Sequence, residues 1–142
     1  MKTGKFMHYA NAAKQRKEKA LDVGKNGMIP HDLWRRFIPI AMEYDRGNAD
    51  MALLYSYLIA KVNGQPDNDR YMSAFPSVDR IAEDTRISRN RIAKLSNALE
   101  ACGLLVTAYD YAANRREKLY YPQYYSELTD AEVRANFDKL TS

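Results

Sequence analysis

The feature that most constrains the fold is a pair of short helical segments separated by only two residues. Apolar residues recur at helical spacing over residues 77–85 and again over residues 88–102, and Arg86 and Ile87 join the two segments. So short a connection forces the two helices to cross at a steep angle, with Ile87 packed between them. The sequence therefore predicts a helix-turn-helix unit.

The second of these helices has two faces of different chemistry. Ile92, Leu95 and Leu99 predict its buried face, and Ser88 supplies its N-cap. The opposite face combines polar side chains with one small residue: Arg89, Asn90, Ala93, Lys94 and Asn97. Arg or Lys can donate to guanine and Asn can bond adenine bidentately, so this face suits a DNA major groove. The alternative interpretation is a solvated, charged face on an ordinary helical hairpin.

A predicted β-hairpin follows the second helix almost without a spacer. Residues 104–112 and 118–123 are strand-like, and the expected inward residues are Val106, Ala108, Leu119 and Tyr121. The turn between them is polar and basic, with Asn114, Arg115, Arg116 and, just beyond, Lys118. A basic hairpin in this position is typical of a wing, which contacts phosphates or a minor groove and adds affinity rather than sequence reading. A hairpin tip can also be charged only because it is exposed.

The combination resembles the winged-helix families. The matching residues are Pro76-Ser77, Ile81-Ala82, Ile87-Ser88-Arg89, Ile92, Leu95, Leu99-Glu100 and Gly103-Leu104-Leu105. The preceding motif ALLYSYL (52–58) extends the likeness, which spans about residues 28–123. This wider arrangement is similar to the N-terminal DNA-binding domain of plasmid replication initiator proteins and of related phage or plasmid regulators.

The resemblance implies roles for individual residues. It assigns DNA-facing roles to the exposed residues of the second helix and to Arg115 and Arg116, whereas Arg91, nearer the core, becomes a phosphate contact. One residue departs from the pattern, because Arg86 stands where these families usually have glycine. Either Arg86 adopts the positive φ of the usual glycine, at a cost of roughly 1 kcal/mol, or the turn is built differently.

Charge is distributed unevenly along the chain. Residues 1–27 contain seven basic and two acidic residues, whereas residues 28–142 have a net charge of −1. Bulk attraction therefore cannot hold the folded part on DNA, and local arrangement must do so. We divide the chain into a basic N-terminal arm or helix (1–27), a winged-helix domain (28–125) and a C-terminal helix (126–142). The arm is either a DNA-tracking tail or a solubilising extension.

Other segments complete the expected fold, which is mainly α with a small β-hairpin. A helix from Ala49 to about Val62, capped by Asn48, is apolar on both sides, so it should be buried within the domain or against a second subunit. The sequence predicts a short strand at Tyr71–Phe75. The C-terminal helix is capped by Thr129, and its apolar stripe is Val133, Phe137 and Leu140. A homodimer would bury the surplus apolar surface of helix 49–62, of the C-terminal helix, or of both.

Several function classes find no support in the composition. The longest apolar run, Met51 to Ala60, has ten residues, and a bilayer span needs about 20. One Cys and two His cannot assemble the usual four-ligand zinc site. A phosphate-binding GxxxxGK[ST] loop is also missing. We expect no enzymatic activity, cofactor, metal or membrane insertion, and the lack of an apolar export segment predicts a cytoplasmic location.

These observations lead to two hypotheses. The first is sequence-specific binding of double-stranded DNA by a homodimer, in plasmid or phage replication initiation or in transcriptional regulation, with a replication or regulatory protein as a further partner. The alternative is a protein-interaction adaptor that uses the winged helix as a scaffold and its basic arm to grip an acidic partner.

Overall fold

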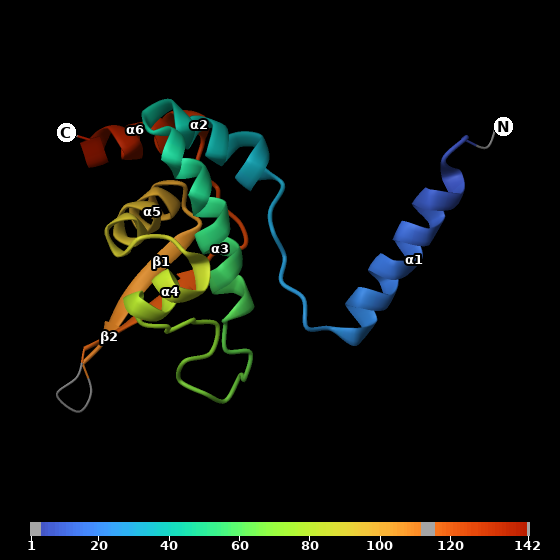
Figure 1. The fold of residues 1–142 in the computed structure, drawn as a ribbon, viewed down its shortest axis with the longest axis horizontal. Coiled ribbons are helices and arrows are strands. Elements are labelled where there is room, and N and C mark those ends of the chain that lie inside the picture. The colour runs from blue at the N-terminus through green and yellow to red at the C-terminus, as the bar shows by residue number, and fades with distance from the viewer. Residues whose placement is uncertain (1–3, 112–115, 142) are drawn as a thin grey trace.

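The computed structural model describes residues 4–111 and 116–141 (Figure 1). The N-terminal elements are α1 (Met7–Val23), the π-helical turn η1 (Leu33–Phe37), α2 (Ile38–Tyr44), the 3-10 turn η2 (Arg46–Asp50) and α3 (Met51–Ala60). The remaining elements are α4 (Val78–Thr85), α5 (Arg89–Ala101), β1 (Leu105–Asp110), β2 (Glu117–Pro122) and α6 (Asp130–Thr141). This order confirms the predicted α+β winged helix-turn-helix fold.

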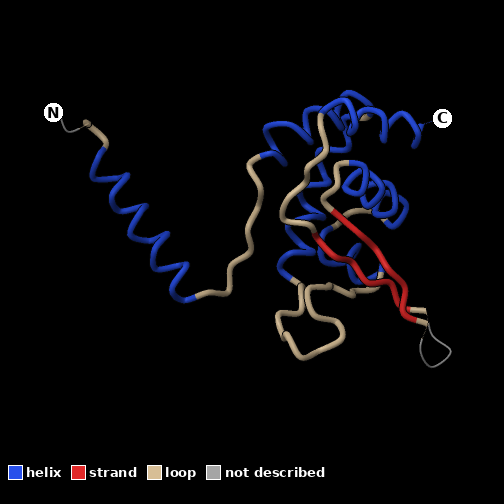
Figure 2. The backbone as a smooth tube through the Cα atoms, turned by 180° about the vertical axis from the view of Figure 1, so that it is seen from behind, coloured by secondary structure: helices blue, strands red, loops and turns tan. Residues whose placement is uncertain are grey.

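Helix α1 stands apart from the body that the other elements form (Figures 1 and 2). None of its residues is buried, and it ends at Gly24, whose φ is 75°. An extended linker then leads to η1, and Gly27 of this linker lies so close to α3 that a Cβ there would overlap the Ile59 side chain. The linker is therefore seated on the body, whereas α1 is not.

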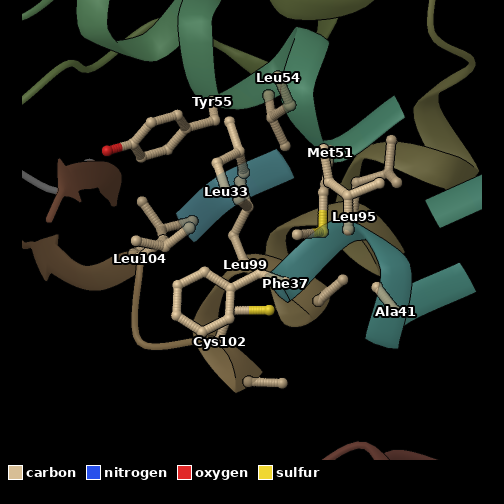
Figure 3. Close-up of a cluster of buried hydrophobic side chains, with 14 of the residues drawn as sticks. Leu33, Phe37, Ala41, Met51, Leu54, Tyr55, Leu95, Leu99, Cys102 and Leu104 are labelled. Carbon is tan, nitrogen blue, oxygen red and sulfur yellow. The ribbon is translucent and has the colours of Figure 1, made fainter. Parts of the chain in front are cut away.

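The core forms where α3 and α5 pack together beneath η1 and α2. Leu54 and Tyr55 of α3 and Leu95 and Leu99 of α5 are at most 2% exposed. Figure 3 shows these side chains in one cluster with Leu33, Phe37 and Cys102. Burial also raises the pKa of the Cys102 thiol to about 12, as expected for a small apolar core residue. Because one side of α5 is fixed in this cluster, its other side must face outward.

The connection between α4 and α5 has the predicted geometry. Ser77 caps α4, since its hydroxyl accepts a hydrogen bond from the Arg80 amide at 3.1 Å. Arg86 ends the helix in the left-handed region, with φ 64°. Ile87 then turns inward and is 3% exposed. Arg86 therefore adopts the positive φ of the usual glycine, and the expected apolar plug at Ile87 is confirmed.

Replacing Arg86 by glycine should stabilise the domain. A non-glycine residue in the left-handed region costs about 1–2 kcal/mol. Glycine avoids this cost but loses about 0.5–1 kcal/mol more conformational entropy on folding. We expect Arg86→Gly to raise the free energy of unfolding by about 0.5–1 kcal/mol in urea titrations. Arg86→Ala is the matched control, because it removes the same side chain and keeps the strained backbone. A glycine variant no more stable than the alanine variant would contradict the prediction.

The hairpin pairs β1 with β2 in antiparallel register, from Leu105 opposite Pro122 to Asp110 opposite Glu117. The predicted strand Tyr71–Phe75 is reduced to a single bridge, in which Ala74 exchanges two backbone hydrogen bonds of 2.8 Å with Tyr120. That bridge places one further extended residue beside β2.

The predicted inward face of β1 is wrong by one residue. Leu105 is 2% exposed, whereas Val106 is 54% exposed and Ala108 is also exposed. In β2, Leu119 is buried as predicted, Tyr121 is half-buried, and the unpredicted Tyr120 is 1% exposed. Leu104 and Leu105 both enter the core after the turn at Gly103, and this sets the alternation that follows.

The segment before α3 also differs from the prediction. Asn48 does not cap the helix, because it is buried in η2 and its amide donates to the Ala41 carbonyl at 2.9 Å. Asp45 caps η2 instead, and its carboxylate accepts from the Gly47 amide at 2.8 Å. Helix α3 then buries one face in the core, while Leu53 on its other side is 46% exposed.

Helix α6 packs against α2 and α5. Thr129 caps it as predicted: its hydroxyl accepts from the Glu132 amide at 3.1 Å, and the Glu132 carboxylate accepts from the Thr129 amide at 3.0 Å. Val133 and Phe137 are buried, but Leu140 is 49% exposed, so the predicted stripe fails at its last residue. The apolar residues that the structure buries in α6 are thus covered within the chain.

Candidate nucleic-acid interface

Helix α5 presents the predicted polar face to solvent. Between residues 89 and 97, the exposed residues, called the recognition face from here on, are Arg89, Asn90, Ala93, Lys94 and Asn97. The side chains of Arg89 and Lys94 are 68% and 66% exposed. Ile92, Leu95 and Leu99 anchor the other side of the helix in the core. The structure therefore brings the five residues of the predicted polar face onto one accessible surface.

Both cations of the recognition face are held in ion pairs. The Arg89 guanidinium lies 3.0 Å from an Asp79 carboxylate oxygen, and the Lys94 ammonium lies 3.0 Å from Asp45. The pKa of Asp45 is lowered, chiefly by the hydrogen bond from the Gly47 amide and then by Lys94. Sequence reasoning did not single out these two aspartates, because each belongs to a different element from α5.

Arg91 and Ser88 flank the recognition face. The Arg91 guanidinium donates to the Asp50 carboxylate at 2.6 Å and to the Gly47 carbonyl at 3.0 Å, which ties α5 to η2. Ser88 occupies the predicted N-cap position in an extended conformation, but its hydroxyl makes no capping hydrogen bond. Its exposed side chain is therefore not committed to the start of the helix.

A groove of about 560 Å³ separates the start of α5 from the hairpin. Arg89 lines it from the helix, and Arg116 and Lys118 line it from the hairpin. The Arg116 guanidinium lies 4.7 Å from the centre of the Tyr109 ring, and the Lys118 ammonium lies 5.0 Å from that of Tyr120. The structure thus joins three predicted cations from two elements in one groove. The predicted residues Asn114 and Arg115 lie outside the described residues.

The stem of the hairpin is fixed by a residue that sequence reasoning missed. Arg70, from the loop after α3, lies 2.8 Å from the Asp110 carboxylate and 2.7 Å from that of Glu117. Its guanidinium compensates two acidic side chains at the outer end of the stem. The position of the hairpin and its local charge therefore both depend on this loop.

The described residues contain no group of three or more His, Cys, Asp or Glu side chains that could hold a metal ion. In the same part of the chain, no helix is long and apolar enough to span a bilayer.

Residues 52–105 match a family described as a helix-turn-helix domain. The match supports a helix-turn-helix DNA-binding domain. It begins in α3, includes all of α4 and α5, and ends where β1 begins. Families of this kind are typically binding domains rather than enzymes. No curated protein and no solved structure matches the chain.

Proposed function

We propose that the protein binds double-stranded DNA sequence-specifically, with α5 in the major groove and the hairpin beside it. The recognition face is the observation that carries this proposal. It combines two Asn side chains that can bond adenine with two cations that can donate to guanine. Ala93 at its centre lets the helix backbone approach the bases.

The neighbouring cations supply affinity that does not depend on sequence. Arg116 and Lys118 face the groove beside α5, and we assign them to phosphates together with Ser88 and Arg91. Asn114 and Arg115 belong to the same proposed wing. Because residues 28–142 have a net charge of −1, binding must rest on this local grouping and on the basic segment 1–27.

We propose that the protein acts as a homodimer, which would place two recognition helices about 34 Å apart on one side of a duplex. Leu53 of α3 and Leu140 of α6 are 46% and 49% exposed, and each is a candidate contact residue. Light scattering at tens of micromolar should give twice the 16.4 kDa of one chain. Leu53→Arg or Leu140→Arg should halve that mass, whereas Val106→Arg should not. A wild-type mass of one chain would exclude the dimer.

The biological role that we propose is plasmid or phage replication initiation or transcriptional regulation, with a replication or regulatory protein as a further partner. Selection of bound sequences from random duplex DNA tests both the specificity and this role. Repeated sites that map to an origin would support initiation, whereas a palindrome at a promoter would support regulation. Recovery of no preferred sequence would contradict sequence-specific binding.

The chain offers a second candidate function through α1. This helix lies away from the body, and residues 1–24 contain six basic and two acidic residues. An adaptor would use the winged helix (28–125) and the C-terminal helix (126–142) as a scaffold and the arm (1–27) to grip an acidic partner. Such an adaptor would keep its partner when Arg89 and Lys94 are replaced by alanine, and it would show no preference among duplex sequences.

A further inference from the structure

The two ion pairs of the recognition face lie at its opposite edges. Successive residues of an α-helix are rotated by about 100°, so Asn90, Ala93 and Asn97 point between the directions of Arg89 and Lys94. Asp79 meets Arg89 from α4, and Asp45 meets Lys94 from the start of η2. Each edge of the surface that would read bases is therefore neutralised by a carboxylate from a neighbouring element.

Both carboxylates are on the short side chain of aspartate, so the backbone position limits where each can lie. Asp45 is fixed by the Gly47 amide through its Oδ1 atom, while its Oδ2 atom holds Lys94. Asp79 lies in the first turn of α4, which Ser77 caps and whose position is set by the buried Ile81. The Asp45 carboxylate is therefore held at its edge of the recognition face independently of Lys94, and α4 holds the backbone of Asp79 at the other edge.

From these contacts we propose that Asp45 and Asp79 are specificity-determining residues that keep Lys94 and Arg89 from binding phosphates on unrelated DNA. This inference rests on the proposed DNA-binding function and deepens it. On a random duplex, a phosphate must displace a carboxylate and remain beside its negative charge. On the correct duplex, base contacts draw the two cations away from the carboxylates. The pairs therefore weaken non-specific binding more than specific binding.

The salt dependence of binding distinguishes binding to a random duplex from binding to the correct duplex. The slope of log affinity against log salt changes by about 0.9 for each phosphate that the protein neutralises. Freeing Arg89 and Lys94 adds phosphate contacts on random DNA only. On the correct duplex the same two cations are already in use, so its slope should not change.

The test compares Asp45→Asn, Asp79→Asn and the double variant in the full chain. Asparagine keeps an acceptor for the Gly47 amide and removes the charge. We expect each substitution to steepen the slope on a random duplex by up to about one unit, with affinity at low salt roughly fivefold or more higher. On the duplex recovered by selection, affinity should rise less and the slope should stay the same. The ratio of specific to non-specific affinity should therefore fall.

Glu127→Gln is the matched control, because it removes one exposed negative charge at the other end of α5. Its neighbour Ser126 donates to the Cys102 carbonyl at 2.6 Å, beyond the last turn of α5 and away from the recognition face. Partial unfolding of an Asn variant would weaken binding to both duplexes and could not steepen a slope.

Three outcomes overturn the inference. In the first, an Asn variant has the same affinity and salt slope on random DNA as Glu127→Gln. In the second, an Asn variant binds random DNA more weakly than the wild type does. In the third, the ratio of specific to non-specific affinity does not change. A wild-type chain that binds no duplex, even at low salt, overturns the proposed function itself and is recognised before any variant is compared.

Discussion

Replacing Arg89 and Lys94 together by alanine should abolish sequence-specific DNA binding while the domain stays folded. Both side chains are about two-thirds exposed and contribute nothing to the core, and alanine favours the helix that carries them. Each good base contact discriminates by about 1–3 kcal/mol, so losing two should weaken specific binding roughly 30- to 20,000-fold. A mobility shift in moderate salt measures the loss, and circular dichroism with urea titration checks the fold.

A second pair of cations provides the control for this variant. Arg134 on α6 pairs with Glu43 at 3.0 Å, and Arg35 in η1 is exposed. Arg35→Ala with Arg134→Ala removes the same charge and one ion pair from η1 and α6 without changing α5, so it should weaken binding only slightly. An unchanged mobility shift in the Arg89/Lys94 variant would show that α5 does not read the major groove.

The helix-turn-helix unit could be predicted from sequence because its determinants are local. Helical spacing identifies the buried residues of α5, and the two-residue connection forces Ile87 inward. Winged-helix families usually have glycine at the position of Arg86, which indicates a left-handed turn there, and Arg86 has a φ of 64°. In each case the residue and the feature that it determines lie within one or two turns of helix.

The predictions that failed depend on contacts between distant segments. The loose alternation of β1 could not set its register, which follows from the entry of Leu104 and Leu105 into a core made by other helices. The helix-capping propensity of Asn48 is overridden because its amide finds the Ala41 carbonyl inside the body. Propensity describes a residue and its near neighbours, whereas these outcomes depend on the packed chain.

The candidate site shows the same division. The sequence predicted the face of α5 and its cations, but it could not predict that Asp45 and Asp79 neutralise them, because those partners are distant or belong to another helix. Arg70 was missed for the same reason, since it lies 40 residues from Asp110 and 47 from Glu117. The candidate residues could thus be found from local pattern, but their ion-pair partners in the free protein could not.

Deleting residues 1–24 should reduce the salt dependence of DNA binding and leave sequence preference intact. The segment contains six basic residues, and each phosphate that they contact adds about 0.9 to the slope of log affinity against log salt. We expect the slope to become shallower by roughly three to five units, and affinity at moderate salt to fall roughly 100-fold or more. Because α1 buries none of its residues, the free energy of unfolding should not change.

The cut after residue 24 keeps Gly27 against Ile59, so the linker remains seated on α3. Replacing Lys14, Arg16, Lys17 and Lys19 by glutamine is the companion variant, because it removes charge while keeping residues compatible with a helix. If charge alone acts, both variants should flatten the slope. An unchanged slope would make the arm a solubilising extension. Loss of preference for the selected duplex would mean that the arm reads bases, and the recognition face would then not be the sole source of specificity.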